Sequence, residues 1–290
     1  MVPLTERVAG APISWGVCEV PGWGFQLDPS LVLAQMQDVG LVATELGPKG
    51  FLPVDPQAAA ATLHEAGLRA VGGFVPVVLH DAGHDPLPEV DTALDALVAA
   101  GAGVIVLAAA TGLEGYDQRP VLDEVAWSRL LANLDRLAAR AHERGVVTAL
   151  HPHVGTMVER RDEVERVLEG SGVDLCLDTG HLLIGGTDPV ELARSVPERI
   201  RHVHLKDVDE RWASKVRAGD ATYTDAVAAG MYRPLGRGDV DVGQIVRLLE
   251  RGGYQGWYVL EQDTVLAGPP DGPGPVADVR TSVDYLRSLG

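Results

Sequence analysis

The stretch VVTALHPHVGTMVERRDEVERVLEGSGVDLCLDTGHLLIGGTDPVELARSVPERIRHVHLKD, residues 146–207, decides the fold. It holds three short apolar runs that are typical of buried strands, separated by longer patterns with the apolar spacing of helices. The strands are 146–150, 173–177 and 200–205, and the helices are 161–168 and 189–196. Strands that alternate with helices in this way form βαβ units and a parallel sheet.

The same alternation continues on both sides of this stretch. The further predicted strands are 8–14, 42–46, 68–78, 104–107 and 256–260. The further predicted helices are 29–39, 56–66, 87–100, 123–144, 242–251 and 276–289. Eight strand–helix units in 290 residues predict an α/β fold, a (β/α)8 TIM barrel with a single domain over residues 1–290. A doubly wound open sheet is the main alternative, but no G-x-G-x-x-G turn follows the first strand.

Capping residues support the predicted boundaries. Aspartate precedes proline at 28–29, 55–56 and 188–189, as expected of an N-cap before a first-turn proline. Glycines follow predicted helices where a left-handed C-cap favours them, at Gly40, Gly67, Gly101, Gly145, Gly172 and Gly252. The segment 209–241 breaks the pattern, because it is long, polar and rich in Gly and Asp. We expect an irregular loop there that covers the site and becomes more ordered with ligand.

The composition of the chain excludes several classes of partner. There are 24 Lys and Arg residues against 41 Asp and Glu residues, for a formal net charge of -17, which argues against nucleic acid and anionic membranes as partners. The only two cysteines, Cys18 and Cys176, form no disulfide framework and lie in no catalytic-cysteine motif. No apolar signal core or membrane-length apolar run is visible, so we expect a cytoplasmic protein.

Polar residues gather at the predicted carboxyl ends of the strands, where a barrel of this kind carries its active site. They are Glu45, His80, Asp81, His84, His151, His153, Asp178, His181, His202, His204, Lys206, Glu261 and Asp263. Imidazoles and carboxylates that converge from neighbouring strands suit a divalent metal of the manganese, cobalt or zinc type. The alternation of side chains along a strand places His151 with His153, and His204 with Lys206, on the same face.

Several of these residues also have a simpler interpretation. His202 lies deeper in the barrel, where a hydrogen-bonded structural role is favoured, and Asp178 could cap a turn. Glu45 could form a surface ion pair with Lys49, although its position at a strand end favours a role in a pocket. Trp15 fits either the core or the wall of a sugar-binding pocket.

Seven short motifs occur in order along nearly the whole chain. They are APISW (11–15), ELG (45–47), HPHVGT (151–156), LDTGHL (177–182), RHVHLKD (201–207), GDVD (238–241) and GGYQGW (252–257). Together they resemble the xylose-isomerase-like barrel superfamily of sugar isomerases and epimerases, and within it the inosose dehydratase branch. The resemblance implies a metal held by His151, Asp178, His204 and Glu261. It also implies manganese or cobalt as the ion, although the ligand types do not exclude zinc.

One position departs from the common pattern of this superfamily. Many members have a glutamate where this chain has His151, and that glutamate is both a ligand and an acid or base. The histidine argues against the two-glutamate epimerase mechanism and favours the dehydratase branch. The resemblance also places His181 and Lys206 beside the substrate.

The reaction that the resemblance implies is dehydration of a keto-cyclitol such as 2-keto-myo-inositol (inosose). A metal would stabilise the enediolate that forms when the α-proton leaves, and a β-hydroxyl would then depart. The candidate bases are Glu261 and Glu45, and the candidate acids are His153, His181 and Lys206. The main alternative is a sugar isomerase or epimerase that acts on a ketose with the same metal site.

Two other classes of function fit the sequence less well. A metal-dependent phosphodiesterase acting on damaged DNA would need several metals and a basic groove, against the charge of -17. A noncatalytic sugar-binding protein would lack metal ligands, whereas a complete candidate set is present. The expected partner is therefore a small-molecule keto-cyclitol or keto-sugar, and assembly into a homo-oligomer stays open.

Overall fold

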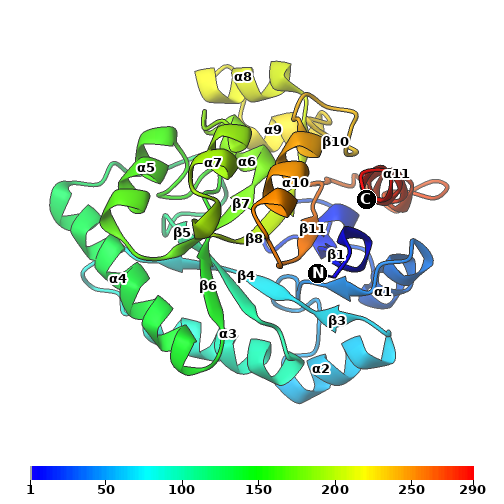
Figure 1. Cartoon of the computed structure of the whole chain (residues 1–290), viewed down its shortest axis with the longest axis horizontal. Coiled ribbons are helices and arrows are strands. Elements are labelled where there is room, and N and C mark those ends of the chain that lie inside the picture. The colour runs from blue at the N-terminus through cyan, green and yellow to red at the C-terminus, as the bar shows by residue number, and fades with distance from the viewer. Residues whose placement is uncertain (1) are drawn as a thin grey trace.

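The parallel strands close into a barrel (Figure 1). The strand segments pair in the order β3-β2-β1-β11-β8-β7-β6-β5-β4. The two ends of this order are β3 (Arg69–Ala70) and β4 (Gly72–Val78). Only Val71 separates them in sequence, so together they form one bent strand that closes the ring. The computed structural model describes residues 2–290, and it confirms the predicted (β/α)8 TIM barrel.

Helices surround this ring and cover its outer face (Figure 1). The other barrel strands are β1 Val8–Gly10, β2 Ala43–Thr44, β5 Val104–Ala110, β6 Val147–Leu150, β7 Asp174–Asp178, β8 Ile200–Leu205 and β11 Tyr258–Leu260. The outer helices are α1 Pro29–Asp38, α2 Pro56–Glu65, α3 Leu87–Ala100, α4 Glu124–Glu143, α5 Arg161–Gly170, α7 Pro189–Ser195, α10 Val242–Arg251 and α11 Val276–Arg287. A short helix that the sequence did not predict, α6 (Thr179–Ile184), follows β7 directly.

The predicted capping residues are mostly confirmed. The side chains of Asp28, Asp55 and Asp188 each accept a hydrogen bond from a backbone amide of the helix that follows. Four of the glycines have the left-handed backbone of a C-cap, namely Gly40, Gly67, Gly101 and Gly145. The predictions for Gly172 and Gly252 were wrong, because α5 runs on to Gly170 and continues into extended chain, and the left-handed residue after α10 is Gly253.

The first strand is shorter than the sequence predicted. It ends at Gly10, and a 3-10 helix occupies Pro12–Trp15. Pro12 has no amide hydrogen to donate to a neighbouring strand, which explains why the ladder stops before it. Trp15 is fully buried in the core and its Nε1 donates to Gln35 Oε1 (2.8 Å), so its interpretation as a core residue is confirmed.

The strand register brings the polar residues to one level of the barrel. Asp178 at the end of β7 pairs with His204 of β8, and His204 in turn pairs with Val259 of β11. The amide of Glu261 continues this ladder by donating to Leu205 O (3.2 Å). Because all these strands are parallel, their carboxyl ends meet at the same mouth of the barrel.

The segment 209–241 has regular structure, so the predicted irregular loop was wrong, whereas its further ordering with ligand stays a prediction. It contains α8 (Glu210–Ala218) and α9 (Tyr223–Ala228), and its strand β10 (Tyr232–Arg233) pairs antiparallel with β9 (Asp207–Val208). The polar residues that made it look like a loop include the helix caps, since Asp209 accepts from Arg211 N and Thr222 accepts from Asp225 N.

The carboxylate of Asp207 holds the two ends of this segment together. Its Oδ2 accepts hydrogen bonds from the amides of Gly236, Arg237 and Gly238, at 2.8–3.1 Å. Its Oδ1 accepts from the amides of Val208 and Val240, both at 3.0 Å. A Cβ on Gly238 would lie 2.3 Å from Asp207 Oδ1, so only glycine permits this close approach.

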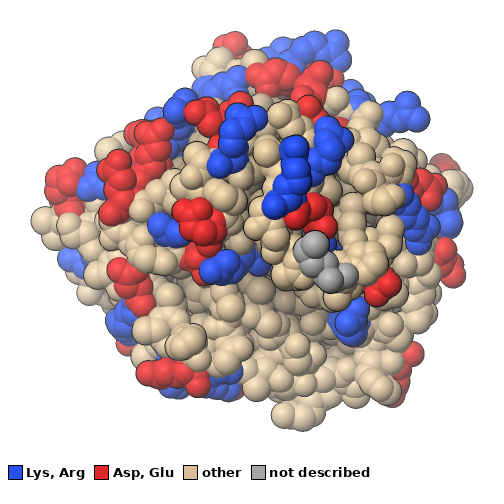
Figure 2. Space-filling view, in the orientation of Figure 1, with Lys and Arg blue, Asp and Glu red and all other residues tan. Residues whose placement is uncertain are grey.

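No helix within residues 2–290 is long and apolar enough to cross a membrane. On the face shown in Figure 2, basic and acidic side chains alternate over the upper part of the molecule, and the area over α2 is largely uncharged.

We predict that Asp207→Asn loosens the segment 209–241. The amide group of asparagine has about the same shape as the carboxylate, but it turns one acceptor oxygen into a donor that faces backbone N–H groups. The loss should be about 1–3 kcal/mol. Hydrogen-exchange mass spectrometry should show faster exchange in this segment. Asp220→Asn, at an exposed position of the same segment, is the control, and equal exchange in the two variants would contradict the prediction.

Candidate functional site

A cavity of about 350 Å³ opens at the carboxyl ends of the strands. Five of the residues predicted from the sequence line it directly, namely Glu45, His151, His153, Lys206 and Glu261. Asp178, His181 and His204 lie just behind them and are buried. His80 and His84, which the sequence also placed at strand ends, line a different depression beside Arg129. The structure thus brings together eight predicted residues and leaves two histidines outside.

Four of these side chains surround one point. One donor atom from each of His151, Asp178, His204 and Glu261 lies within 4.8 Å of the donor atoms of the other three. His151 Nε2 is 3.3 Å from Asp178 Oδ2, and His204 Nδ1 is 3.3 Å from Glu261 Oε2. All four residues are buried. This is the same set that the family resemblance implied as metal ligands.

The hydrogen bonds around the four residues leave the correct atoms free for a cation. His151 Nδ1 donates to Pro152 O (2.8 Å), so the proton is on Nδ1 and the lone pair of Nε2 faces the common point. Asp178 Oδ1 accepts from the amides of Gly180 and His181 and so caps α6. Asp178 Oδ2 is buried without a hydrogen-bond partner among residues 2–290. Asp178 therefore both caps α6 and presents a free oxygen.

The carboxylate of Glu45 orients the ring of His204. His204 Nε2 donates to Glu45 Oε1 (3.0 Å), and His204 Nδ1 is buried without a hydrogen-bond partner in the described part of the chain. Burial opposes protonation of His204, but Cys176, Glu261 and Glu45 outweigh it and raise its pKa well above the usual value, so a bound cation would take the place of a proton on Nδ1. His202 Nε2 donates to the same oxygen (2.7 Å), as expected of a structural histidine. Burial opposes ionisation of Glu45, but His204 and His202 outweigh it and hold its pKa below the usual range. Glu45 pairs with these histidines and not with Lys49.

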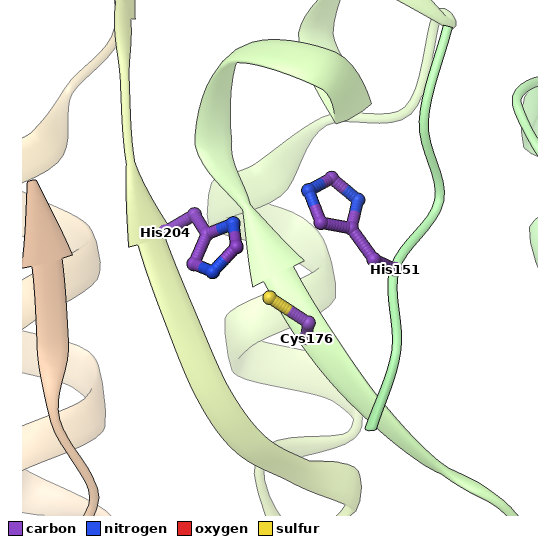
Figure 3. A group of neighbouring side chains, drawn as sticks. All are labelled: His151, Cys176 and His204. Carbon is purple, nitrogen blue, oxygen red and sulfur yellow. The ribbon is translucent and has the colours of Figure 1, made fainter. Parts of the chain in front are cut away.

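Cys176 lies next to the two histidines but is a poorer donor than the carboxylates. Figure 3 shows His151 and His204 on either side of β7, with Cys176 on that strand between them. The three side chains form a second group that could hold a metal. Burial raises the pKa of the thiol to about 11, so it stays protonated at neutral pH. The carboxylate set is therefore the better site for a divalent ion such as manganese.

Lys206 extends its ammonium into the same site. Its Nζ lies 3.0 Å from Glu261 Oε2 and 3.2 Å from His181 Nε2, and it donates to Asp263 Oδ1. Burial alone would lower the pKa of Lys206, but Asp263, Glu261 and Asp178 raise it well above the usual value. Burial likewise opposes ionisation of Glu261, yet His204 and Lys206 lower its pKa to about 2. The site thus holds a charged lysine beside an ionised glutamate.

His153 and His181 form a stacked pair beside the metal group. Their ring centroids are 3.7 Å apart with planes inclined by 30°. Burial and the neighbouring charges lower the pKa of both rings well below the usual value, so both are neutral. His153 Nδ1 donates to Val154 O (2.7 Å), which leaves Nε2 as an acceptor. His153 can therefore accept a proton from a ligand in the cavity.

Three contributions to the site were missed from the sequence. Asp263 was seen at a strand end, but no role was assigned to it, although it is two residues after Glu261 and alternation places both on one face. Tyr223 donates to Asp263 Oδ2 (2.6 Å) from the segment 209–241, for which the sequence predicts an irregular loop. Trp23 and Tyr116, which pack edge-to-face, line the cavity and gave no signal in the sequence.

Comparison with known proteins agrees with this architecture. Residues 35–289 match the family described as the xylose isomerase-like TIM barrel. The chain belongs to this family. The match covers the barrel from α1 to α11 and includes the four residues around the common point. The family expected from the sequence motifs is thus confirmed.

Relatives within the family include an inosose dehydratase from Geobacillus thermodenitrificans. It is 32% identical over 272 residues, which cover 89% of this chain and 91% of that protein. The crystal structure of the IolI protein with a zinc atom has a TM-score of 0.70 at 14% identity and covers 98% of this chain and 97% of that one. The apo form of 3-keto-D-glucoside 4-epimerase YcjR from E. coli has a TM-score of 0.68 at 17% identity, covering 97% and 99%. At such identities the two structures establish the shared fold alone.

We predict that Glu45→Gln weakens the binding of divalent metal by about tenfold, since partners of metal-ligating histidines tune their affinity. Glutamine keeps an oxygen that can accept from His202 and His204 but removes the negative charge. Titration of the metal-free protein with Mn²⁺ or Co²⁺ measures the effect. Glu19→Gln, at the rim of the same cavity, is the control, and equal affinities in both variants would show that the charge of Glu45 plays no part.

Proposed function

We propose that the protein is a metal-dependent dehydratase that removes water from a keto-cyclitol such as 2-keto-myo-inositol. The group formed by His151, Asp178, His204 and Glu261 carries this proposal, because two imidazole nitrogens and two carboxylates converge beside a cavity of substrate size. Similarity to an inosose dehydratase over most of the chain supports the reaction and the substrate class.

The same four residues would hold the metal ion. Their donor atoms fit a divalent cation, since within residues 2–290 Asp178 Oδ2 and His204 Nδ1 are buried without a hydrogen-bond partner. We propose manganese or cobalt, because mixed carboxylate and imidazole ligands suit these ions, with zinc as the other candidate. When bound, such an ion supplies a Lewis acid that polarises the substrate ketone and makes the α-proton more acidic.

Lys206 is the proposed acid. Its ammonium is held at the cavity wall, 3.0 Å from Glu261 Oε2, where it can protonate a departing hydroxyl. His153 was grouped with the acids in the sequence, but its acceptor Nε2 suits the opposite role. We propose that His153 or Glu261 takes the α-proton. His181 stacks on His153 behind the cavity, and Glu45 orients His204.

These roles account for each bond that breaks or forms in the reaction. The C–H bond at the α-carbon breaks and its proton goes to the base. The C–O bond to the β-hydroxyl breaks, and the hydroxyl leaves as water with a proton from Lys206. A double bond forms between the two carbons, so the product is the enol form of a dione. An epimerase would instead return the proton to carbon, and it would not need a separate acid for a leaving group.

The proposed function is tested with purified protein that has been stripped of metal and reloaded. We expect 2-keto-myo-inositol to yield a dione and water, with activity abolished by chelator and restored by manganese or cobalt. Product formation is followed by NMR. Asp178→Asn is the matched variant, because it keeps an oxygen to cap α6 but loses the charge, and it should lose both metal and activity. Conversion of ketoses without conversion of inososes would favour the epimerase.

We predict that Lys206→Met lowers kcat by about 10² to 10⁴, which is the usual contribution of a general acid, and leaves metal content nearly unchanged. Methionine keeps much of the apolar stem and removes the ammonium. Lys215→Met, at an exposed position of α8, is the control. Steady-state kinetics and metal analysis of both variants decide the role, and a kcat close to that of the unmodified enzyme would exclude Lys206 as the acid.

A further inference from the structure

Asp263 makes two strong contacts that the proposed chemistry does not use. Its Oδ1 accepts from the ammonium of Lys206, and its Oδ2 accepts from the hydroxyl of Tyr223 (2.6 Å). All three residues are buried, and Asp263 and Lys206 line the cavity. A carboxylate that is held by a donor on each oxygen cannot rotate without losing one of the two bonds. Asp263 is thus fixed between the proposed acid and a tyrosine.

Tyr223 belongs to the segment after β8 and is itself firmly placed. Its amide donates to Asp117 Oδ1 (2.7 Å), which ties the start of α9 to the loop after β5. Its hydroxyl is also 3.0 Å from the hydroxyl of Tyr232. The ring of Tyr232 lies beneath Lys206, with Nζ 5.2 Å from the ring centroid, within the range of a cation–π contact. The segment therefore contacts the ammonium directly through Tyr232 and indirectly, by way of Asp263, through Tyr223.

We propose that Tyr223 is a positioning residue for the proposed acid, and that it acts through Asp263. The proposal rests on the proposed function, because the step that it supports is proton donation by Lys206. Tyr223 does not touch the cavity, so it contributes by keeping the Asp263 carboxylate in one orientation. Asp263 in turn keeps the ammonium of Lys206 against Glu261.

The chemistry of the lysine side chain explains why such support is needed. Its four-carbon stem is flexible, and its ammonium can donate hydrogen bonds in many directions, whereas the planar guanidinium group of arginine donates in fixed directions. The Lys206 ammonium has carboxylates within reach at Glu261, Asp263 and Asp178, the last at 3.8 Å. Without the hydroxyl of Tyr223, Asp263 can turn both oxygens towards Lys206 and draw it away from Glu261. A shift of this kind misplaces the acid without removing it.

A double-mutant cycle tests the proposal. The variants are Tyr223→Phe, Asp263→Asn and the double variant, with Tyr254→Phe as the matched control. Tyr254 is also buried and its hydroxyl also donates a hydrogen bond, but to the backbone carbonyl of Trp257 (2.9 Å) and not to a carboxylate of the site. We expect Tyr223→Phe to lower kcat by about tenfold, with KM and metal content nearly unchanged. Tyr254→Phe should leave kcat as it is.

The double variant distinguishes positioning from a general structural effect. If Tyr223 acts through Asp263, the double variant has the same kcat as Asp263→Asn, because the tyrosine has nothing left to position. Losses that multiply, or an equal loss in Tyr254→Phe, would overturn the proposal.

A second measurement does not depend on the reaction. The chain has only three lysines, Lys49, Lys206 and Lys215, so NMR of protein labelled with ¹⁵N-lysine can follow each ammonium group. We expect one slowly exchanging ammonium signal, that of Lys206, whose exchange accelerates in Tyr223→Phe and not in Tyr254→Phe. Unchanged exchange in Tyr223→Phe would overturn the proposal. If the enzyme leaves inososes untouched while this difference is seen, the proposed function fails and the positioning of Lys206 by Tyr223 stands.

Discussion

The register of parallel strands β7, β8 and β11 is the constraint on which the site depends. It brings Asp178, His204 and Glu261 to one level, and His151 completes the group from the end of β6. Buried carboxylates repel one another and are costly to remove from water, so such a group is stable only with positive charge nearby. Here that charge comes from Lys206, and a divalent cation would add to it. The mouth of the barrel thus carries a group of side chains that could hold a metal ion.

The hydrogen bonds behind these residues decide what each can do. Backbone carbonyls fix the protons of His151 and His153 on Nδ1, and Glu45 fixes that of His204 on Nε2. As a result the second ring nitrogens of His151 and His204 face the same point, and His153 turns a lone pair to the cavity. Residue type alone would allow each histidine to be a donor or an acceptor. The neighbours select one state for each.

The segment after β8 shows how a barrel of common design acquires particular chemistry. It is anchored at its ends by Asp207 and sends Tyr223 and Tyr232 to the back of the site. The strands position the four candidate ligands, whereas this segment places Tyr232 beside Lys206 and Tyr223 against Asp263. A similar fold is found in an epimerase and in the zinc-containing IolI protein, so the fold alone does not determine the type of reaction.

The sequence by itself determined the barrel, its helix caps and the strand ends at which histidines and carboxylates lie. These features depend on short-range patterns, such as apolar periodicity and an aspartate before a proline, which act within one element. The family motifs added the ligand set of His151, Asp178, His204 and Glu261. Only the tertiary structure decided that Glu45 accepts from His204, that Asp263 accepts from Lys206 and that Tyr223 donates to Asp263. The physical reason is that hydrogen bonds such as that of Glu45 with His204, 159 residues apart, depend on how the whole ring closes, and no local pattern records it.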